Sequence, residues 1–82
     1  MSNFNRETTR QNIFLLLHSS GLSDEQFANF LGISLRWLGY LKSGKYDFKI
    51  DEIEKASLFF NLPFNTLTSK NLRVSQNLRE EL

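Results

Sequence analysis

Apolar residues recur at helical spacing in successive blocks of the chain, and glycine, asparagine and proline separate the blocks. No stretch shows the alternation of apolar and polar residues, bounded by turn residues, that is typical of a β-strand. The pattern therefore predicts an all-α fold of five helices. These run from between Asn5 and Thr8 to Ser20, between Ser23 and Gly32, over about 35–42, over about 50–60, and from Pro63 through Leu67.

The residues at the ends of these blocks have the chemistry of helix caps. A serine or threonine followed three residues later by glutamine can satisfy two of the free backbone N–H groups at a helix start. Glycine or asparagine after the last turn can adopt the left-handed conformation that closes a helix. The predicted caps are a Thr8–Gln11 box for the first helix, a Ser23–Gln26 box for the second, Ser34 for the third, and Gly21 and Asn61 at helix ends.

Helical periodicity also divides the apolar residues into an inward set and a remainder. The inward set is Ile13, Leu16, Leu17 and Ser20, then Phe27, Ala28 and Leu31, and in the fourth helix Ile50, Ile53, Ala56, Ser57 and Phe60. The remainder is Phe14, Leu15, Leu58 and Phe59. A small domain should not leave all of these in water. We expect residues 1–69 to form one domain and 70–82 a polar tail or short helix. Either this tail or a second protomer then covers the four remaining apolar residues. In the second case these residues form a homodimer interface, which Leu78 and Leu82 extend.

The three residues Gly32, Ile33 and Ser34 join the second and third predicted helices. A link this short forces the two helices to cross steeply, which is the helix-turn-helix arrangement. Gly32 is free to adopt a positive φ, and Ala28 is small enough to allow a close crossing. A rotation of 100° per residue turns the third helix so that Trp37, Leu38 and Leu41 face the core. The residues that the same rotation turns outward are Leu35, Arg36, Gly39, Tyr40 and Ser43.

The formal net charge of the 82 residues is only +1, but the basic residues are unevenly placed. Residues 33–50 carry four basic residues and one acidic residue, whereas residues 21–32 carry two acidic residues and no basic one. The positive charge therefore gathers on the third helix and on the loop that follows it.

The composition limits the chemistry that the chain can perform. With no cysteine and one histidine, it has no disulfide, no thiolate metal site and no multi-histidine metal site within one chain. We recognise no nucleophile with a base partner, no glycine-rich phosphate loop, and no cofactor or small-molecule site, so the sequence does not predict an enzyme. No apolar run could span a bilayer and the first residues lack a signal-peptide pattern, so we expect a cytoplasmic protein without membrane contact.

The order and spacing of these residues resemble the Cro and lambda-repressor type (XRE-like) of helix-turn-helix regulators over roughly residues 8–69. The matching positions are the run from Gly21 to Ala28, the run from Leu31 to Ser34, Leu38, Leu41, Gly44, Lys45, Ile50, Ile53, the run from Phe59 to Pro63, and Leu67. The resemblance implies a compact five-helix domain that binds operator DNA, usually as a homodimer. Many such regulators control phage, plasmid or toxin–antitoxin genes.

The chain departs from that family at two places that bear on DNA binding. The second helix of the family usually begins with a glutamine that contacts a phosphate, and here the residue is Asp24. A carboxylate about 6 Å from a phosphate costs roughly 0.7–3 kcal/mol, depending on the effective dielectric. The outward face of the third helix is also apolar, with Arg36 as its one strong base-reading side chain.

The sequence thus predicts a sequence-specific, non-enzymatic transcriptional regulator, a repressor of the phage, plasmid or mobile-element type, that binds double-stranded DNA as a homodimer. The residues expected to face bases are Leu35, Arg36, Gly39 and Tyr40. Those expected to contact phosphates are Ser34, Lys42, Ser43, Lys45, Tyr46 and Lys49. Asp24, the low net charge and the apolar face favour an alternative, in which the fold serves as a protein-interaction module. A third interpretation is a regulator that needs a protein partner to reach DNA.

Overall fold

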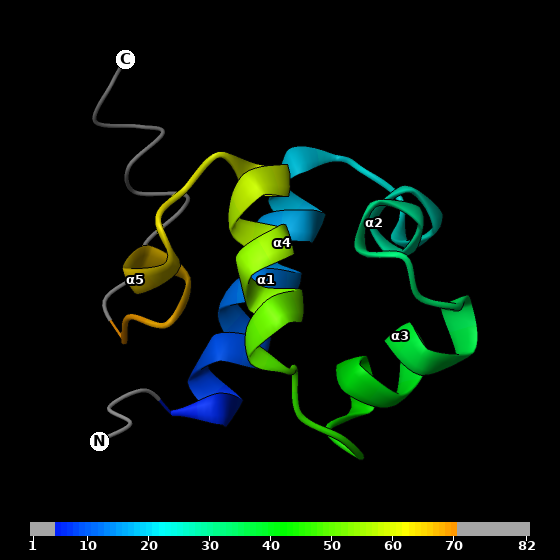
Figure 1. Ribbon diagram of the computed structural model, residues 1–82, viewed down its shortest axis with the longest axis horizontal. Helices are drawn as coiled ribbons and strands as arrows, with labels where there is room; N and C mark the ends of the chain where they lie inside the picture. The colour runs from blue at the N-terminus through cyan, green and yellow to red at the C-terminus, as the bar shows by residue number, and fades with distance from the viewer. Residues whose placement is uncertain (1–4, 71–82) are drawn as a thin grey trace.

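The computed structural model describes residues 5–70. Its helices are α1 (Arg6–Ser20), α2 (Asp24–Leu31), α3 (Leu35–Ser43), α4 (Ile50–Phe60) and α5 (Phe64–Leu67). No strand occurs within these residues, so the predicted all-α class is confirmed (Figure 1). Apart from Lys70, the tail predicted for 70–82, with Leu78 and Leu82, lies outside the described residues.

Most helix ends have the caps that the sequence predicts. The Ser23 hydroxyl accepts the N–H of Gln26 at 3.1 Å, and the Gln26 side chain accepts the N–H of Ser23 at 2.9 Å, so this capping box is confirmed. The Thr8–Gln11 box is wrong, because α1 begins earlier and the Asn5 side chain accepts the N–H of Thr8 at 3.0 Å. The other predicted caps, Ser34, Gly21 and Asn61, are present.

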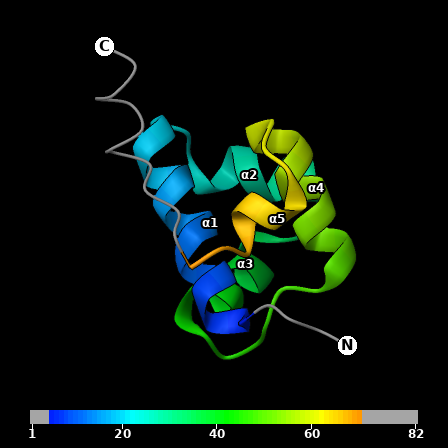
Figure 2. The ribbon, with the colours of Figure 1, turned by 90° about the vertical axis from the view of Figure 1, so that its left-hand side faces the viewer.

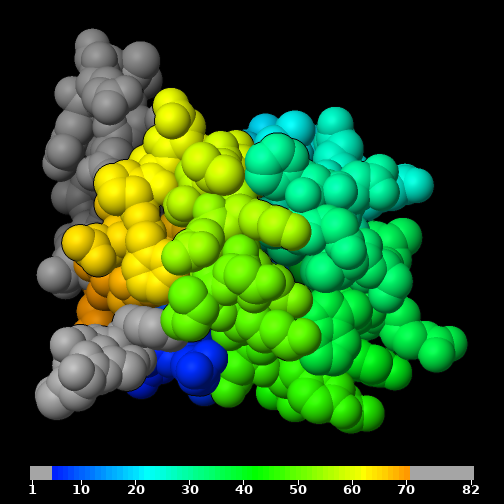
Figure 3. Space-filling view, in the orientation of Figure 1, coloured from blue at the N-terminus to red at the C-terminus, as the bar shows by residue number. Residues whose placement is uncertain are grey.

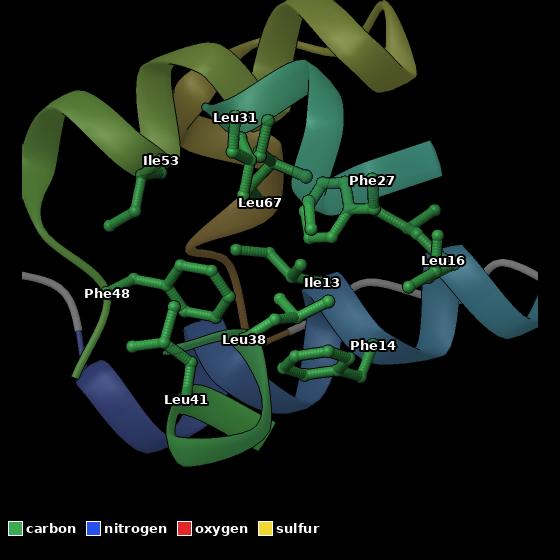
Figure 4. Close-up of a cluster of buried hydrophobic side chains, with 13 residues drawn as sticks. Ile13, Phe14, Leu16, Phe27, Leu31, Leu38, Leu41, Phe48, Ile53 and Leu67 are labelled. Carbon is green, nitrogen blue, oxygen red and sulfur yellow. The ribbon is translucent and has the colours of Figure 1, made fainter. Parts of the chain in front are cut away.

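The helices α1 and α4 form two sides of the fold, and the other three close it. In Figure 2, α5 lies in front between α1 and α4, while α2 and α3 lie behind. Helix α4 packs on α2 and α5, and α1 packs on α3 and α5. The core lies in the space that they enclose (Figure 4). It includes Ile13, Leu17, Phe27, Leu31, Leu38, Leu41, Ile53 and Leu67, each at most 2% exposed.

Phe14 corrects the sequence interpretation of α1. It is 8% exposed, and its ring lies among the core side chains, 6.5 Å from that of Phe27 and 5.8 Å from that of Phe48 between centroids (Figure 4). The prediction that Phe14 lies off the core face, in a dimer interface, is therefore wrong. The physical reason is that α3 and the loop after it cover a second side of α1, which widens its buried face. Phe48 of that loop is itself 3% exposed.

The start of α4 also differs from the prediction. Ile50 is 46% exposed rather than inward, because it is the first residue of the helix and the core begins one turn later, at Ile53. Glu52 is buried in its place, with 6% exposed. Ser20, predicted inward, is exposed in the last turn of α1.

The remaining unassigned apolar residues behave in two ways. Phe59 is half-buried and packs against Phe27 and Phe30, with ring centroids 5.1 Å apart in both pairs. Leu15 and Leu58 stay exposed, Leu58 to 72%. Of the six residues in the predicted dimer interface, four lie within residues 5–70, and among these four only Leu15 and Leu58 are largely exposed.

Candidate nucleic-acid interface

The pair α2 and α3 has the predicted three-residue link. Gly32 has a φ of 76°, and its N–H donates to the carbonyl oxygen of Ala28 at 2.9 Å, which ends α2. The Ser34 hydroxyl accepts the N–H of Trp37 at 3.0 Å, which starts α3 after only two further residues. In Figure 1, α2 is seen nearly end on while α3 runs across the view, so the two helices cross steeply.

The outward face of α3 is the one that helical rotation predicts. Leu38 and Leu41 are buried, while Leu35 is 53% exposed and Arg36 and Gly39 are also exposed. Tyr40 is half-buried at the side of this face. The helix lies at the edge of the molecule away from α5 (Figure 3). The four residues expected to face bases are therefore together on one accessible surface.

Two residues of this face are unconstrained by the rest of the fold. Within residues 5–70, no hydrogen bond or ion pair holds the guanidinium of Arg36. A Cβ atom placed on Gly39 would meet no atom within 4 Å. Glycine in a helix interior costs about 0.5–1 kcal/mol relative to alanine, and the packing of the described chain supplies no reason for it.

A cluster of aromatic rings lies beside the outward face of α3. We call Trp37, Tyr40 and Tyr46 the aromatic cluster. The rings of Trp37 and Tyr46 stack with centroids 5.0 Å apart and an interplanar angle of 27°. Tyr40 lies edge-on to both, at 6.2 Å from Trp37 and 5.7 Å from Tyr46. Trp37, which the sequence analysis turns towards the core, packs against the core cluster but stays half-buried.

The aromatic cluster holds two of the lysines predicted to contact phosphates. The Lys45 ammonium is 4.7 Å from the centre of the Tyr40 ring, and the Lys49 ammonium is 5.5 Å from the centre of the Trp37 ring. At these distances the electron-rich ring faces attract the cations. The structure thus brings Lys45, Lys49 and Tyr46 together around the aromatic rings of α3.

Both serine hydroxyls predicted to contact phosphates make hydrogen bonds within the chain, but only that of Ser43 uses its hydrogen. The Ser43 hydroxyl donates to the carbonyl oxygen of Tyr40 at 3.1 Å, so this hydrogen is already used. The Ser34 hydroxyl accepts a backbone N–H as the α3 cap, which leaves its own hydrogen available.

Lys42 is paired with Asp24, which the sequence analysis did not anticipate. The Lys42 ammonium is 3.2 Å from a carboxylate oxygen of Asp24, and both side chains are 45% exposed. The same ammonium lies 6.0 Å from the centre of the Phe14 ring. Asp24 therefore neutralises a cation that would otherwise be free at this surface.

Sequence reasoning missed three further side chains that position the interface. Arg6 donates to the carbonyl oxygen of Phe48 at 3.0 Å, and Arg10 donates to that of Lys42 at 3.4 Å. Glu52 accepts a hydrogen bond from the indole N–H of Trp37 at 2.9 Å. The partners are 42, 32 and 15 residues apart, so no local sequence pattern could have indicated them.

A solved structure similar to this chain is that of a transcriptional regulator from Listeria innocua. The TM-score is 0.66 and the sequences are 23% identical, over 89% of this chain and 74% of the other. The likeness supports the fold. No protein-family model and no curated protein matches the sequence. Within residues 5–70, no helix is long and apolar enough to cross a membrane.

Proposed function

We propose that this chain is a sequence-specific DNA-binding regulator of transcription that places α3 in the major groove. The observation that carries the proposal is the exposed face of α3. Within residues 5–70, no hydrogen bond or ion pair holds Arg36, no atom lies within 4 Å of a Cβ placed on Gly39, and Lys45 and Lys49 lie over the rings beside this face. In helix-turn-helix domains the second helix of the pair reads base edges in this way. The fold shared with the transcriptional regulator from Listeria innocua supports the same function.

The chemistry of the face assigns a role to each residue. Arg36 can donate two hydrogen bonds to the O6 and N7 atoms of a guanine, and Leu35 can contact a thymine methyl group. Gly39 allows a close approach of the helix backbone to the bases. Lys45 and Lys49 contact phosphates and set the position of α3.

The protein acts as a homodimer in this proposal, and as a repressor of the kind that the family resemblance implies. A two-fold axis buries the same patch on both protomers. Leu15 and Leu58 are exposed apolar residues that such a contact could cover. Two copies of α3 about 34 Å apart would then meet successive turns of a palindromic operator.

Selection of bound fragments from random duplex DNA by the purified chain tests the proposal. We expect a single palindromic site, with an affinity that falls steeply as salt is raised, because bound lysines and arginines release counterions. Recovery of fragments without a shared sequence would contradict sequence-specific binding.

The second candidate is a protein-interaction module. Leu35 leaves 53% of its apolar side chain exposed on the outward face of α3, and Asp24 forms an ion pair with the ammonium of Lys42. An apolar interface would respond little to salt, whereas DNA binding would respond strongly. The salt dependence of the affinity for the bound partner therefore distinguishes a DNA-binding regulator from a protein-interaction module.

A further inference from the structure

Glu52 is the buried acidic side chain within residues 5–70, and both of its carboxylate oxygens accept hydrogen bonds. One oxygen accepts the backbone N–H of Lys49 at 2.8 Å, at the start of α4. The other accepts the indole N–H of Trp37 at 2.9 Å, from α3. A single carboxylate therefore ties α3 to α4 across the loop that carries Lys45 and Tyr46.

The aromatic cluster depends on this tie. Trp37 is the ring on which Tyr46 stacks and over which the Lys49 ammonium lies. Tyr46 in turn packs against Tyr40, the ring nearest the Lys45 ammonium. Each lysine is thus placed by a ring that Glu52 holds either directly or through one neighbour.

We propose that Glu52 is a positioning residue for DNA binding, which orients Lys45 and Lys49 towards the phosphate backbone through Trp37. The inference rests on the proposed function and adds to it a residue that touches no DNA. Long lysine side chains lose conformational freedom when they bind a phosphate. Rings that already hold the ammonium groups in place reduce that loss, and Glu52 holds the rings.

The role requires a carboxylate rather than any polar side chain. Glu52 meets two N–H donors, and a carboxylate offers an acceptor to each of them. A glutamine amide has one acceptor oxygen and an NH₂ group, so one of the two donors would face another donor. The Trp37→Phe variant lacks the indole donor, so the single acceptor oxygen of a glutamine at position 52 is enough to accept the backbone N–H of Lys49.

This difference gives a double-mutant cycle with Glu52→Gln and Trp37→Phe. Binding of a labelled duplex of random sequence is measured over a series of salt concentrations, with circular dichroism to establish that every variant is folded at the temperature used. Glu54→Gln is the matched control, because it makes the same charge change at an exposed position of α4.

We expect Glu52→Gln to weaken binding about three- to tenfold and to lower the log–log salt slope by about one unit, as the loosening of one phosphate contact would. Loss of a negative charge near DNA should by itself tighten binding. The weakening that we expect for Glu52→Gln is therefore opposite in direction to a charge effect. We expect no weakening in Glu54→Gln. In the Trp37→Phe background, Glu52→Gln should add no further loss.

The fluorescence of Trp37, the one tryptophan of the chain, reports on the tie without DNA. Its emission should shift in folded Glu52→Gln, which loses a partner of the indole, and stay unchanged in Glu54→Gln. Equal DNA binding by Glu52→Gln and Glu54→Gln would overturn the inference and leave the proposed function standing. A wild-type chain that binds no duplex at any salt concentration would overturn the proposed function, and the inference with it.

Discussion

Replacing Asp24 with asparagine should tighten the binding of DNA, because it releases the ammonium of Lys42. The two charged groups are 3.2 Å apart in the free protein. Asparagine keeps the shape of the side chain and removes its charge. In the wild type, a phosphate must compete with Asp24 for Lys42 and must also approach a carboxylate of its own sign.

The structure sets the size of the two effects. Both side chains are 45% exposed, so the ion pair contributes only about 0–1 kcal/mol to the stability of the fold. Loss of an acidic residue from the first turn of α2 removes about another 0.3–1 kcal/mol of favourable interaction with the helix dipole. Against this small loss of stability, we expect DNA affinity to rise by about 1–2 kcal/mol, roughly 5- to 30-fold.

Fluorescence anisotropy on the selected operator and on a random duplex, each over a range of salt, measures the effect. Both affinities should rise together, and the salt slope should steepen by about one unit as Lys42 becomes a phosphate contact. Glu25→Gln is the matched control, because Glu25 is the exposed neighbour of Asp24 on the same helix and is free of ion pairs within residues 5–70. Equal tightening by the two variants would show that the effect comes from net charge alone. Weaker DNA binding by Asp24→Asn would refute the idea that Asp24 competes with phosphate for Lys42.

Four further substitutions test other parts of the proposed interfaces. Arg36→Ala should cost about 1–3 kcal/mol of binding free energy at the operator and relax the specificity at one base position, whereas Lys45→Ala should weaken binding to all duplexes alike. Gel shifts on matched and mismatched sites measure both effects, and equal losses of affinity for Arg36→Ala on the two sites would show that Arg36 only contacts phosphate. Gly39→Ala should stabilise the fold by about 0.5–1 kcal/mol in chemical unfolding, because its Cβ meets no atom, and should weaken operator binding; unchanged binding would exclude a close approach of the backbone to DNA. Leu58→Glu should lower self-association in sedimentation equilibrium without loss of helicity, because Leu58 is 72% exposed; an unchanged dimer constant would remove Leu58 from the interface.

Local physics explains which features of the fold could be read from the sequence. The Ser23–Gln26 box and the left-handed Asn61 depend on groups within a few residues of one another, so residue type and spacing are sufficient. The same holds for the outward face of α3, since a regular helix turns every residue by a known angle. Arg36 and Leu38 could therefore be assigned to opposite faces before the structure was known.

The tertiary structure decided what surrounds each of these elements. Helical periodicity treats a helix as having one buried stripe, but α1 meets α5 on one side and α3 on another, so Phe14 enters the core. The hydrogen bond between Trp37 and Glu52 joins residues 15 positions apart, and the ion pair between Asp24 and Lys42 joins residues 18 positions apart. Contacts of that kind depend on how helices pack, which residue spacing along one helix does not encode. Sequence alone thus placed the outward face of α3, and the packing of the helices determined which cations beside it are held by rings and which by a carboxylate.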